Sequence, residues 1–211
     1  MIAVSTLRNF TDRAHPYSRN QIRAHESWTQ VFETIVYFNS TEQPEMRNGK
    51  TRFLPAEEFP RIVDIAEFCA NQDQWCCIIN ADIYVSPAMR RIESALKTKH
   101  AWAASSWRHE FNPDVGIDPC ERVDNGLDFF AAIPSIWSRV FRDVPDTLRL
   151  GCQTWDSWML GWFAMHAQEG FDDITPSKAI RHPKHEHRNY GPIPPPVHFH
   201  GWPVMSAVAI H

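Results

Sequence analysis

The feature that most constrains the fold is the segment Cys76–Ile79, a continuous apolar run that ends at Asn80-Ala81-Asp82. Ser86 and Pro87 then open a helical pattern, since serine favours the N-cap and proline the first helical turn. A short apolar run that leads into a helical pattern predicts a strand buried on both faces, as in a parallel α/β sheet. Ligands of such sheets bind beyond the carboxyl ends of the strands, so Asn80 and Asp82 are expected at a ligand site.

The spacing of Asn80 and Asp82 indicates one kind of chemistry. Residues two apart in an extended chain point the same way, and two oxygen-bearing side chains suit a hard divalent cation that carries a diphosphate. The alternative is that Asp82 belongs to a turn and caps the following helix, a common position for aspartate. The pattern leaves both interpretations open.

Helical and extended patterns alternate along most of the chain. Strands are expected at residues 2–6, 34–38, 76–79, 101–107 and 127–133, and helices at 18–32, 59–70, after 86, from 134 and at 155–169. Residues 41–53 and 114–125 are expected as turn and loop, and the His- and Pro-rich chain after residue 180 as irregular. This alternation predicts an α/β fold with a central, mostly parallel sheet flanked by helices.

Composition limits the class of protein. A chain of 211 residues that is 43% hydrophobic can bury the core of one domain, expected over residues 1–187, with a His/Pro-rich tail at 188–211 packed on it. A net charge of −4 does not favour an electrostatic nucleic-acid binder. No apolar run reaches about eighteen residues, so no membrane span is expected. Five cysteines, two of them adjacent, make a disulfide framework unexpected and predict a cytoplasmic protein.

Two further acids are candidates for catalysis. Asp128 interrupts the apolar strand expected at 127–133, and Asp156 begins the strongest helical pattern, between Trp155 and Trp158. Flat aromatic faces can frame a sugar ring, although most tryptophans are expected in the core. Asp156 has an alternative role, because an acid in a first helical turn gains up to about 1 kcal/mol from the helix dipole. Thr154 can cap that helix, which places Asp156 in its first turn.

A histidine-rich segment follows near the end of the chain. His182 and His185 can ligate a metal if a carboxylate converges on them. The alternative is a solvated surface run of histidines.

Taken in order, these segments resemble the GT-A glycosyltransferases, which have the nucleotide-diphospho-sugar transferase fold. The segments at 2–6, 21–28 and 34–38 resemble the nucleotide-binding start of that fold. Ile79–Ile83 looks like its D-x-D metal motif with Asn80 in place of the first aspartate. Segments 126–130 and 154–158 are similar to its acceptor-side strand and the following helix start, and 180–187 to the region of its late metal histidine.

The resemblance implies a glycosyltransferase that uses a nucleotide-diphospho-sugar donor and Mn²⁺ or Mg²⁺. It implies metal ligation by Asp82 with His182 or His185, and a catalytic base at Asp156 or, second, at Asp128. Contacts to the sugar donor are implied at Thr6, Arg8, Asn39 and Asn80. Asn39 is expected to hydrogen-bond the nucleoside, and Arg8 either pairs with phosphate oxygens or is a solvated loop charge. The acceptor stays open between a glycan, a small molecule and a modified nucleic-acid base, and so does the oligomeric state.

Two alternatives remain. A sugar nucleotidyltransferase shares the fold, but it usually has a glycine-rich basic loop after the first strand, and residues 8–13 contain no glycine. A non-catalytic nucleotide-sugar or carbohydrate-binding module is the other alternative, because Asn80 removes one carboxylate from the metal motif.

Overall fold

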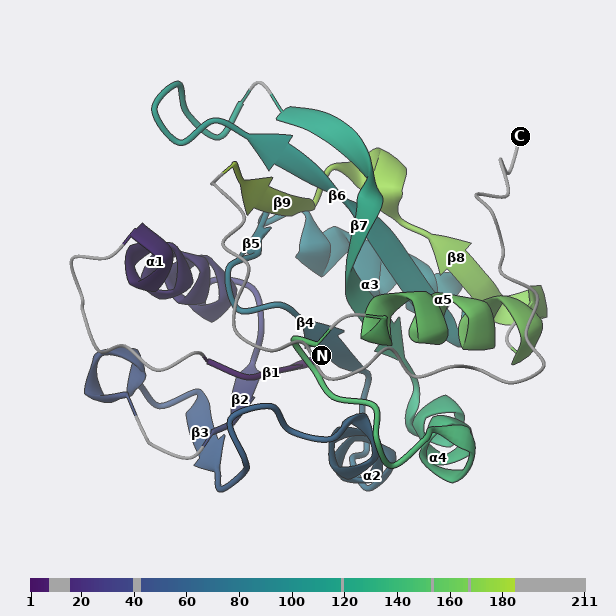
Figure 1. Cartoon of the computed structure of the whole chain (residues 1–211). Coiled ribbons are helices and arrows are strands. Elements are labelled where there is room, and N and C mark those ends of the chain that lie inside the picture. Colours follow the sequence, from purple (N-terminus) through teal and green to yellow (C-terminus); the bar gives the residue numbers. More distant parts are fainter. Residues whose placement is uncertain (8–15, 40–42, 119, 153, 167, 185–211) are drawn as a thin grey trace.

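The computed structural model describes residues 1–7, 16–39, 43–118, 120–152, 154–166 and 168–184; the side chains of residues 16, 17, 123–125 and 168 are also left undescribed. Within these ranges the chain forms five α-helices and nine strands (Figure 1). The helices are α1 Pro16–Thr29, α2 Ile62–Ala70, α3 Met89–Thr98, α4 Pro134–Asp143 and α5 Trp155–His166. The strands are β1 Ile2–Ser5, β2 Thr34–Phe38, β3 Thr51–Leu54, β4 Cys76–Ile79, β5 Tyr84–Val85, β6 Ala103–Phe111, β7 Cys120–Ala132, β8 Phe171–Asp173 and β9 Ile180–Pro183.

One mixed sheet joins all nine strands in the order β3-β2-β1-β4-β7-β6-β9-β5, with β8 paired to β6. Five of its eight strand pairings are parallel, which confirms the predicted mostly parallel sheet. The strands β3, β2, β1 and β4 form a parallel half, and β7 then runs antiparallel to both β4 and β6. The alternation of elements did not predict this reversal.

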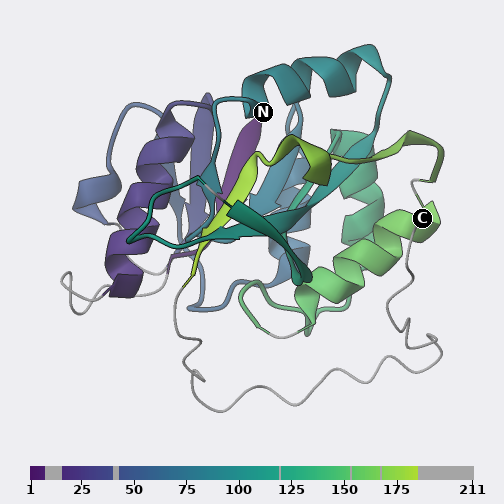
Figure 2. The ribbon, with the colours of Figure 1, turned by 90° about the horizontal axis from the view of Figure 1, so that it is seen from above.

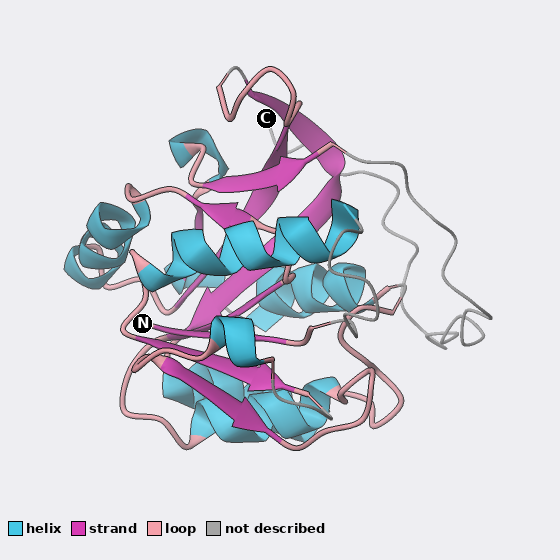
Figure 3. Cartoon of the chain, turned by 90° about the vertical axis from the view of Figure 1, so that its left-hand side faces the viewer, coloured by secondary structure: helices cyan, strands magenta, loops and turns pink. Residues whose placement is uncertain are grey.

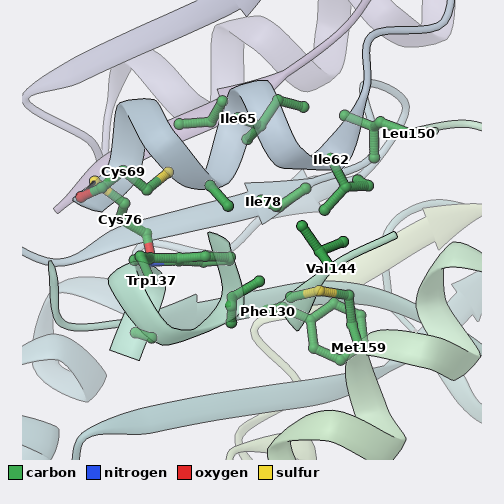
Figure 4. Packing of buried hydrophobic residues seen from close by; sticks show 14 of the residues in the cluster. Ile62, Ile65, Cys69, Cys76, Ile78, Phe130, Trp137, Val144, Leu150 and Met159 are labelled. Carbon is green, nitrogen blue, oxygen red and sulfur yellow. Dashed lines mark hydrogen bonds between the residues drawn. The ribbon is translucent and has the colours of Figure 1, made fainter. Parts of the chain in front are cut away.

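Helices cover both faces of the sheet, so strand residues alternate between two cores. Cys76 and Ile78 of β4 face the core built with α2, α4 and α5, whereas Cys77 and Ile79 face the core built with α1 and α3. Figures 2 and 3 show helices on opposite sides of the strands. In the first core, the Trp137 indole lies below Cys76 and Ile78 (Figure 4) and donates a hydrogen bond of 3.1 Å to the Cys76 carbonyl.

Most predicted elements are present, within a few residues at their ends. The strands at 34–38 and 76–79 match their predicted bounds, and the helix expected after residue 86 begins at Met89. The helix expected at 155–169 ends at His166. Of the eight tryptophans within the described ranges, six are buried, as expected for core residues: Trp28, Trp75, Trp137, Trp155, Trp158 and Trp162.

Two expectations were wrong, and one strand was missed. The loop expected at 114–125 ends at Cys120, where β7 begins. This part of β7 pairs with the end of β6 as a hairpin, although its sequence is mostly polar. The chain after residue 180 is not irregular at once, because Ile180–Pro183 forms β9 between β6 and β5. The polar region 41–53 contains the start of the edge strand β3. The tail predicted at 188–211 lies outside the described residues.

Candidate active site

Asn80 and Asp128 meet where β4 ends. The backbone N–H of Asn80 donates to the Asp128 carbonyl at 3.2 Å, which continues the antiparallel pairing of β4 with β7. The Asn80 side chain also donates to the Asp128 carboxylate, with 2.5 Å between Nδ2 and Oδ1. The asparagine therefore holds one of the two candidate bases at the carboxyl end of β4.

Asp82 lies one turn further on, against His182 of β9. Its Oδ2 is 3.3 Å from His182 Nε2, and both side chains are buried. Helix α1 fixes this turn, because the Trp28 indole N–H donates to the Ile83 carbonyl at 2.6 Å. Strand β9 brings His182 to this turn, although the two residues lie a hundred positions apart in the sequence.

Two charged residues of β6, Arg108 and Glu110, connect these pairs. The Arg108 guanidinium donates to Asp128 Oδ2 and to Glu110 Oε1, both at 3.1 Å. Glu110 Oε1 lies 3.8 Å from His182 Nδ1. The polar groups therefore form a continuous network from Asn80 through Asp128, Arg108, Glu110 and His182 to Asp82.

The sequence analysis missed Arg108 and Glu110. The strand was expected to end at residue 107, so the two residues fell outside it. An extended chain through residue 111 would have put their side chains on one face, because they are two residues apart. The signal that could have identified them is a pair of opposite charges two residues apart.

A β-bulge aims Asp128 into the network. Ser106 pairs with Phe129 and Trp107 with Leu127, so Asp128 has no direct partner on β6. Bulges bend a strand and redirect side chains, and they are frequent beside active sites. The bulge explains how the one acid in the apolar inner part of β7, residues 127–132, reaches the carboxyl end of β4.

Gly126, next to the bulge, gives room to the Arg108 side chain. A Cβ at this position would lie 2.5 Å from Arg108 Nε and 2.6 Å from its Cζ. Arg108 Nε is buried, and it has no hydrogen-bond partner among the described residues. The guanidinium is therefore packed against the Gly126 backbone, with its two terminal nitrogens directed to the carboxylates.

Asp156 starts α5 beside this network. Burial raises the pKa of the Asp156 carboxyl, the nearby Asp128 charge raises it further, and the N–H of Ser157, which donates to Asp156 Oδ1 at 2.8 Å, opposes the shift. The Ser157 hydrogen bond belongs to a first helical turn, so the structural role predicted as an alternative is present. It accounts for one oxygen of the carboxylate.

The backbone before Asp156 is strained. Thr154 has φ +76°, a conformation that costs a β-branched residue of the order of 1–3 kcal/mol. Its buried Oγ1 has no hydrogen-bond partner among the described residues, so the prediction that Thr154 caps the helix was wrong. The tryptophans beside Asp156 are core residues: Trp155 packs edge-on against Phe130, and Trp158 stacks on Trp162. Neither presents a face that could frame a sugar.

Thr6 and Asn39 lie together at the carboxyl ends of β1 and β2. Asn39 Oδ1 accepts hydrogen bonds from the Leu7 N–H at 2.6 Å and from the Thr6 hydroxyl at 3.2 Å. These contacts join the two strand ends, so Asn39 has a structural role whatever else it binds. Arg8 and His185, also predicted as site residues, lie outside the described residues.

Among the described residues, no three His, Cys, Asp or Glu side chains are grouped as a complete metal site, and no helix is long and apolar enough to cross a membrane.

No protein family and no curated protein matches the sequence. Solved structures do resemble the fold. A putative glucose-1-phosphate thymidylyltransferase from Bacillus anthracis has a TM-score of 0.52 and 9% identity, over 83% of this chain and 87% of its own. The 4-diphosphocytidyl-2C-methyl-D-erythritol synthase of Anaerococcus prevotii has a TM-score of 0.51 and 10% identity, over 82% and 87%.

The TarS 1–349 protein of S. aureus, solved in complex with UDP-GlcNAc, has a TM-score of 0.55 and 9% identity, over 89% of this chain and 59% of its own. The identities are too low to carry an activity across, and the agreement concerns the fold. The chain shares the nucleotide-diphospho-sugar transferase fold of these structures, the GT-A-like architecture that the order and spacing of its motifs resemble.

Proposed function

We propose that this protein is a glycosyltransferase that moves a sugar from a nucleotide-diphospho-sugar to an acceptor hydroxyl, with a divalent cation held by Asp82 and His182. The observation that carries the proposal is the contact between these two residues, 3.3 Å apart at the carboxyl end of a central strand of this fold. Ligands of open α/β sheets bind at that edge.

The two residues fit a cation that arrives with a diphosphate. Mg²⁺ keeps several waters and takes one or two protein carboxylates together with substrate phosphates, so a full protein cage is not required. An imidazole beside the carboxylate favours Mn²⁺. When bound, the cation neutralises the charge that develops on the departing diphosphate.

The balance of charge supports a cation requirement. Four carboxylates lie in this network or beside it, those of Asp82, Glu110, Asp128 and Asp156, and the Arg108 guanidinium is already paired with two of them. A diphosphate that approached this network without a counter-ion would meet an excess of negative charge. We therefore expect binding of the donor to depend on the metal.

Asp156 is the better candidate for the general base. Both oxygens of Asp128 are engaged, one by Asn80 and one by Arg108, and these two contacts hold that carboxylate in place. For Asp156, burial outweighs the opposing Arg108 charge and raises the pKa. A base with a raised pKa accepts a proton more readily. In an inverting reaction the acceptor oxygen bonds to the anomeric carbon, the bond from that carbon to the phosphate oxygen breaks, and Asp156 takes the hydroxyl proton.

The proposal is tested by incubating the protein with UDP-, GDP-, CDP- and TDP-sugars, with Mn²⁺ or with EDTA, and measuring release of the nucleoside diphosphate. The expected result is that the nucleoside diphosphate is released from at least one of these nucleotide-sugars, and only when the metal is present. Release of pyrophosphate from a nucleoside triphosphate and a sugar 1-phosphate would instead identify a nucleotidyltransferase. Metal-dependent binding of a donor without either reaction would identify a binding module.

The role of Asp156 is tested with Asp156→Asn, which keeps the shape of the side chain and removes its basicity. We expect turnover to fall roughly a hundredfold or more with little change in Tm. A stability loss of up to about 1 kcal/mol with near-normal turnover would leave Asp156 as a residue of the first helical turn.

A further inference from the structure

We propose that Glu110 is a positioning residue that fixes the imidazole of His182 for metal binding, and that Arg108 holds Glu110 for this task. The inference rests on the proposed function, since it concerns the ligand set suggested there. Neither Arg108 nor Glu110 belongs to the strand-end motif or to the histidine-rich segment.

Glu110 and His182 are direct neighbours in the sheet. They are Cα partners in the parallel pairing of β6 with β9, so their side chains leave the same face side by side. The two nitrogens of the His182 ring face different carboxylates: Nε2 lies 3.3 Å from Asp82 Oδ2, and Nδ1 lies 3.8 Å from Glu110 Oε1. Both acids therefore lie along the ring, at its two nitrogen ends.

This arrangement decides which nitrogen serves the metal. A cation that shares Asp82 must bind His182 through Nε2, the nitrogen on the Asp82 side. The ring is neutral when it ligates a metal, so its remaining proton must lie on Nδ1, which faces Glu110. A carboxylate that accepts this proton fixes the tautomer and the orientation of the ring and makes the ligand more basic. For this hydrogen bond to form when the metal binds, the 3.8 Å separation between Nδ1 and Glu110 Oε1 must shorten to about 3 Å.

Arg108 fixes the acid that faces the ring. Its terminal nitrogen lies 3.1 Å from Glu110 Oε1, and its side chain is 11% exposed. The same guanidinium is anchored on Asp128 and packed on Gly126, so it has little freedom to move. Glu110 is therefore held from one side by the largely buried Arg108 cation, and its carboxylate faces His182 on the other.

The test is the affinity for Mn²⁺ alone, read by electron paramagnetic resonance from the amount of free aqueous ion. We expect Glu110→Gln to weaken binding by about 10- to 100-fold, the usual effect of losing a carboxylate behind a ligating histidine. Glu67→Gln is the matched control, because Glu67 is an exposed acid on α2; it is expected to bind Mn²⁺ like the unmodified protein. Glu110→Asp keeps the charge and is expected to recover part of the affinity.

The outcomes separate this inference from the proposed function. If His182→Ala weakens Mn²⁺ binding and Glu110→Gln does not, the metal site stands and the positioning role is overturned. If neither Asp82→Ala nor His182→Ala changes Mn²⁺ binding, the metal site fails and the positioning role fails with it. A lower Tm of Glu110→Gln at unchanged Mn²⁺ affinity would make Glu110 a structural residue and would also overturn the inference.

Discussion

The substitution Gly126→Ala tests how the network is held together. The new Cβ would lie 2.5–2.8 Å from three atoms of Arg108, so either the guanidinium or the strand must move. Arg108 cannot swing away freely, because it is held by Asp128 and Glu110 at 3.1 Å each. Overpacking at a buried position costs about 1–3 kcal/mol. For a domain of this size that corresponds to a fall in Tm of roughly 2–12 °C.

The measurement is urea or thermal unfolding of four proteins: the unmodified chain, Gly126→Ala, Arg108→Ala and the double variant. Removing the Arg108 side chain leaves the buried Asp128 and the half-buried Glu110 without their cation and is expected to cost about 3–5 kcal/mol. It also removes the atoms with which the added methyl group would clash, so Gly126→Ala should cost close to nothing in that background. Gly49→Ala is the control, since a Cβ there meets no atom within 4 Å. An equal cost of Gly126→Ala with and without Arg108 would refute the reasoning.

Two further predictions concern residues outside the network. Burial lowers the pKa of His25 to about 4, below its ordinary value of 6.5, so between pH 6.5 and pH 4 the unfolded chain binds a proton that the folded protein does not. The unfolding free energy should therefore fall by up to about 3 kcal/mol as the pH drops through this range, and equal pH dependence in His25→Gln would contradict this assignment. Asn39→Ala removes the acceptor of the buried Leu7 N–H and should lower the unfolding free energy by about 1–3 kcal/mol. Unchanged stability with weaker nucleotide binding would instead identify Asn39 as a residue that contacts the nucleotide-sugar.

The parallel half of the sheet could be predicted from the sequence because its strands are buried on both faces. Such strands are short apolar runs between helical patterns, as at Thr34–Phe38 and Cys76–Ile79, and both were found with their bounds. The hairpin of β6 and β7 could not be read in this way. Its outer part carries polar residues on both faces, so neither the alternation nor the apolar run that marks a strand is present there.

The candidate site could be predicted only where a polar residue directly follows a recognisable buried strand. Asn80 and Asp82 follow an apolar run, and that position alone puts them at the edge where ligands bind. The partner of Asp82 could be narrowed to the histidine-rich segment, but the choice of His182 required the pairing of β9 with β6. The pattern that suggested a cap at Thr154 failed because the backbone there has a positive φ, which residue type does not reveal in a threonine.

The candidate site depends on the register in which β6 pairs with β7 and β9. Arg108 and Glu110 share one face of β6, and His109 between them is buried on the other. A slip of β6 by one residue would turn both charged side chains away from Asp128 and His182 and bring His109 in their place. The bulge at Asp128 and the room at Gly126 fix this register from β7, and the pairing of Glu110 with His182 fixes it from β9. Changes in the hairpin that leave every site residue in the sequence can therefore still abolish the network.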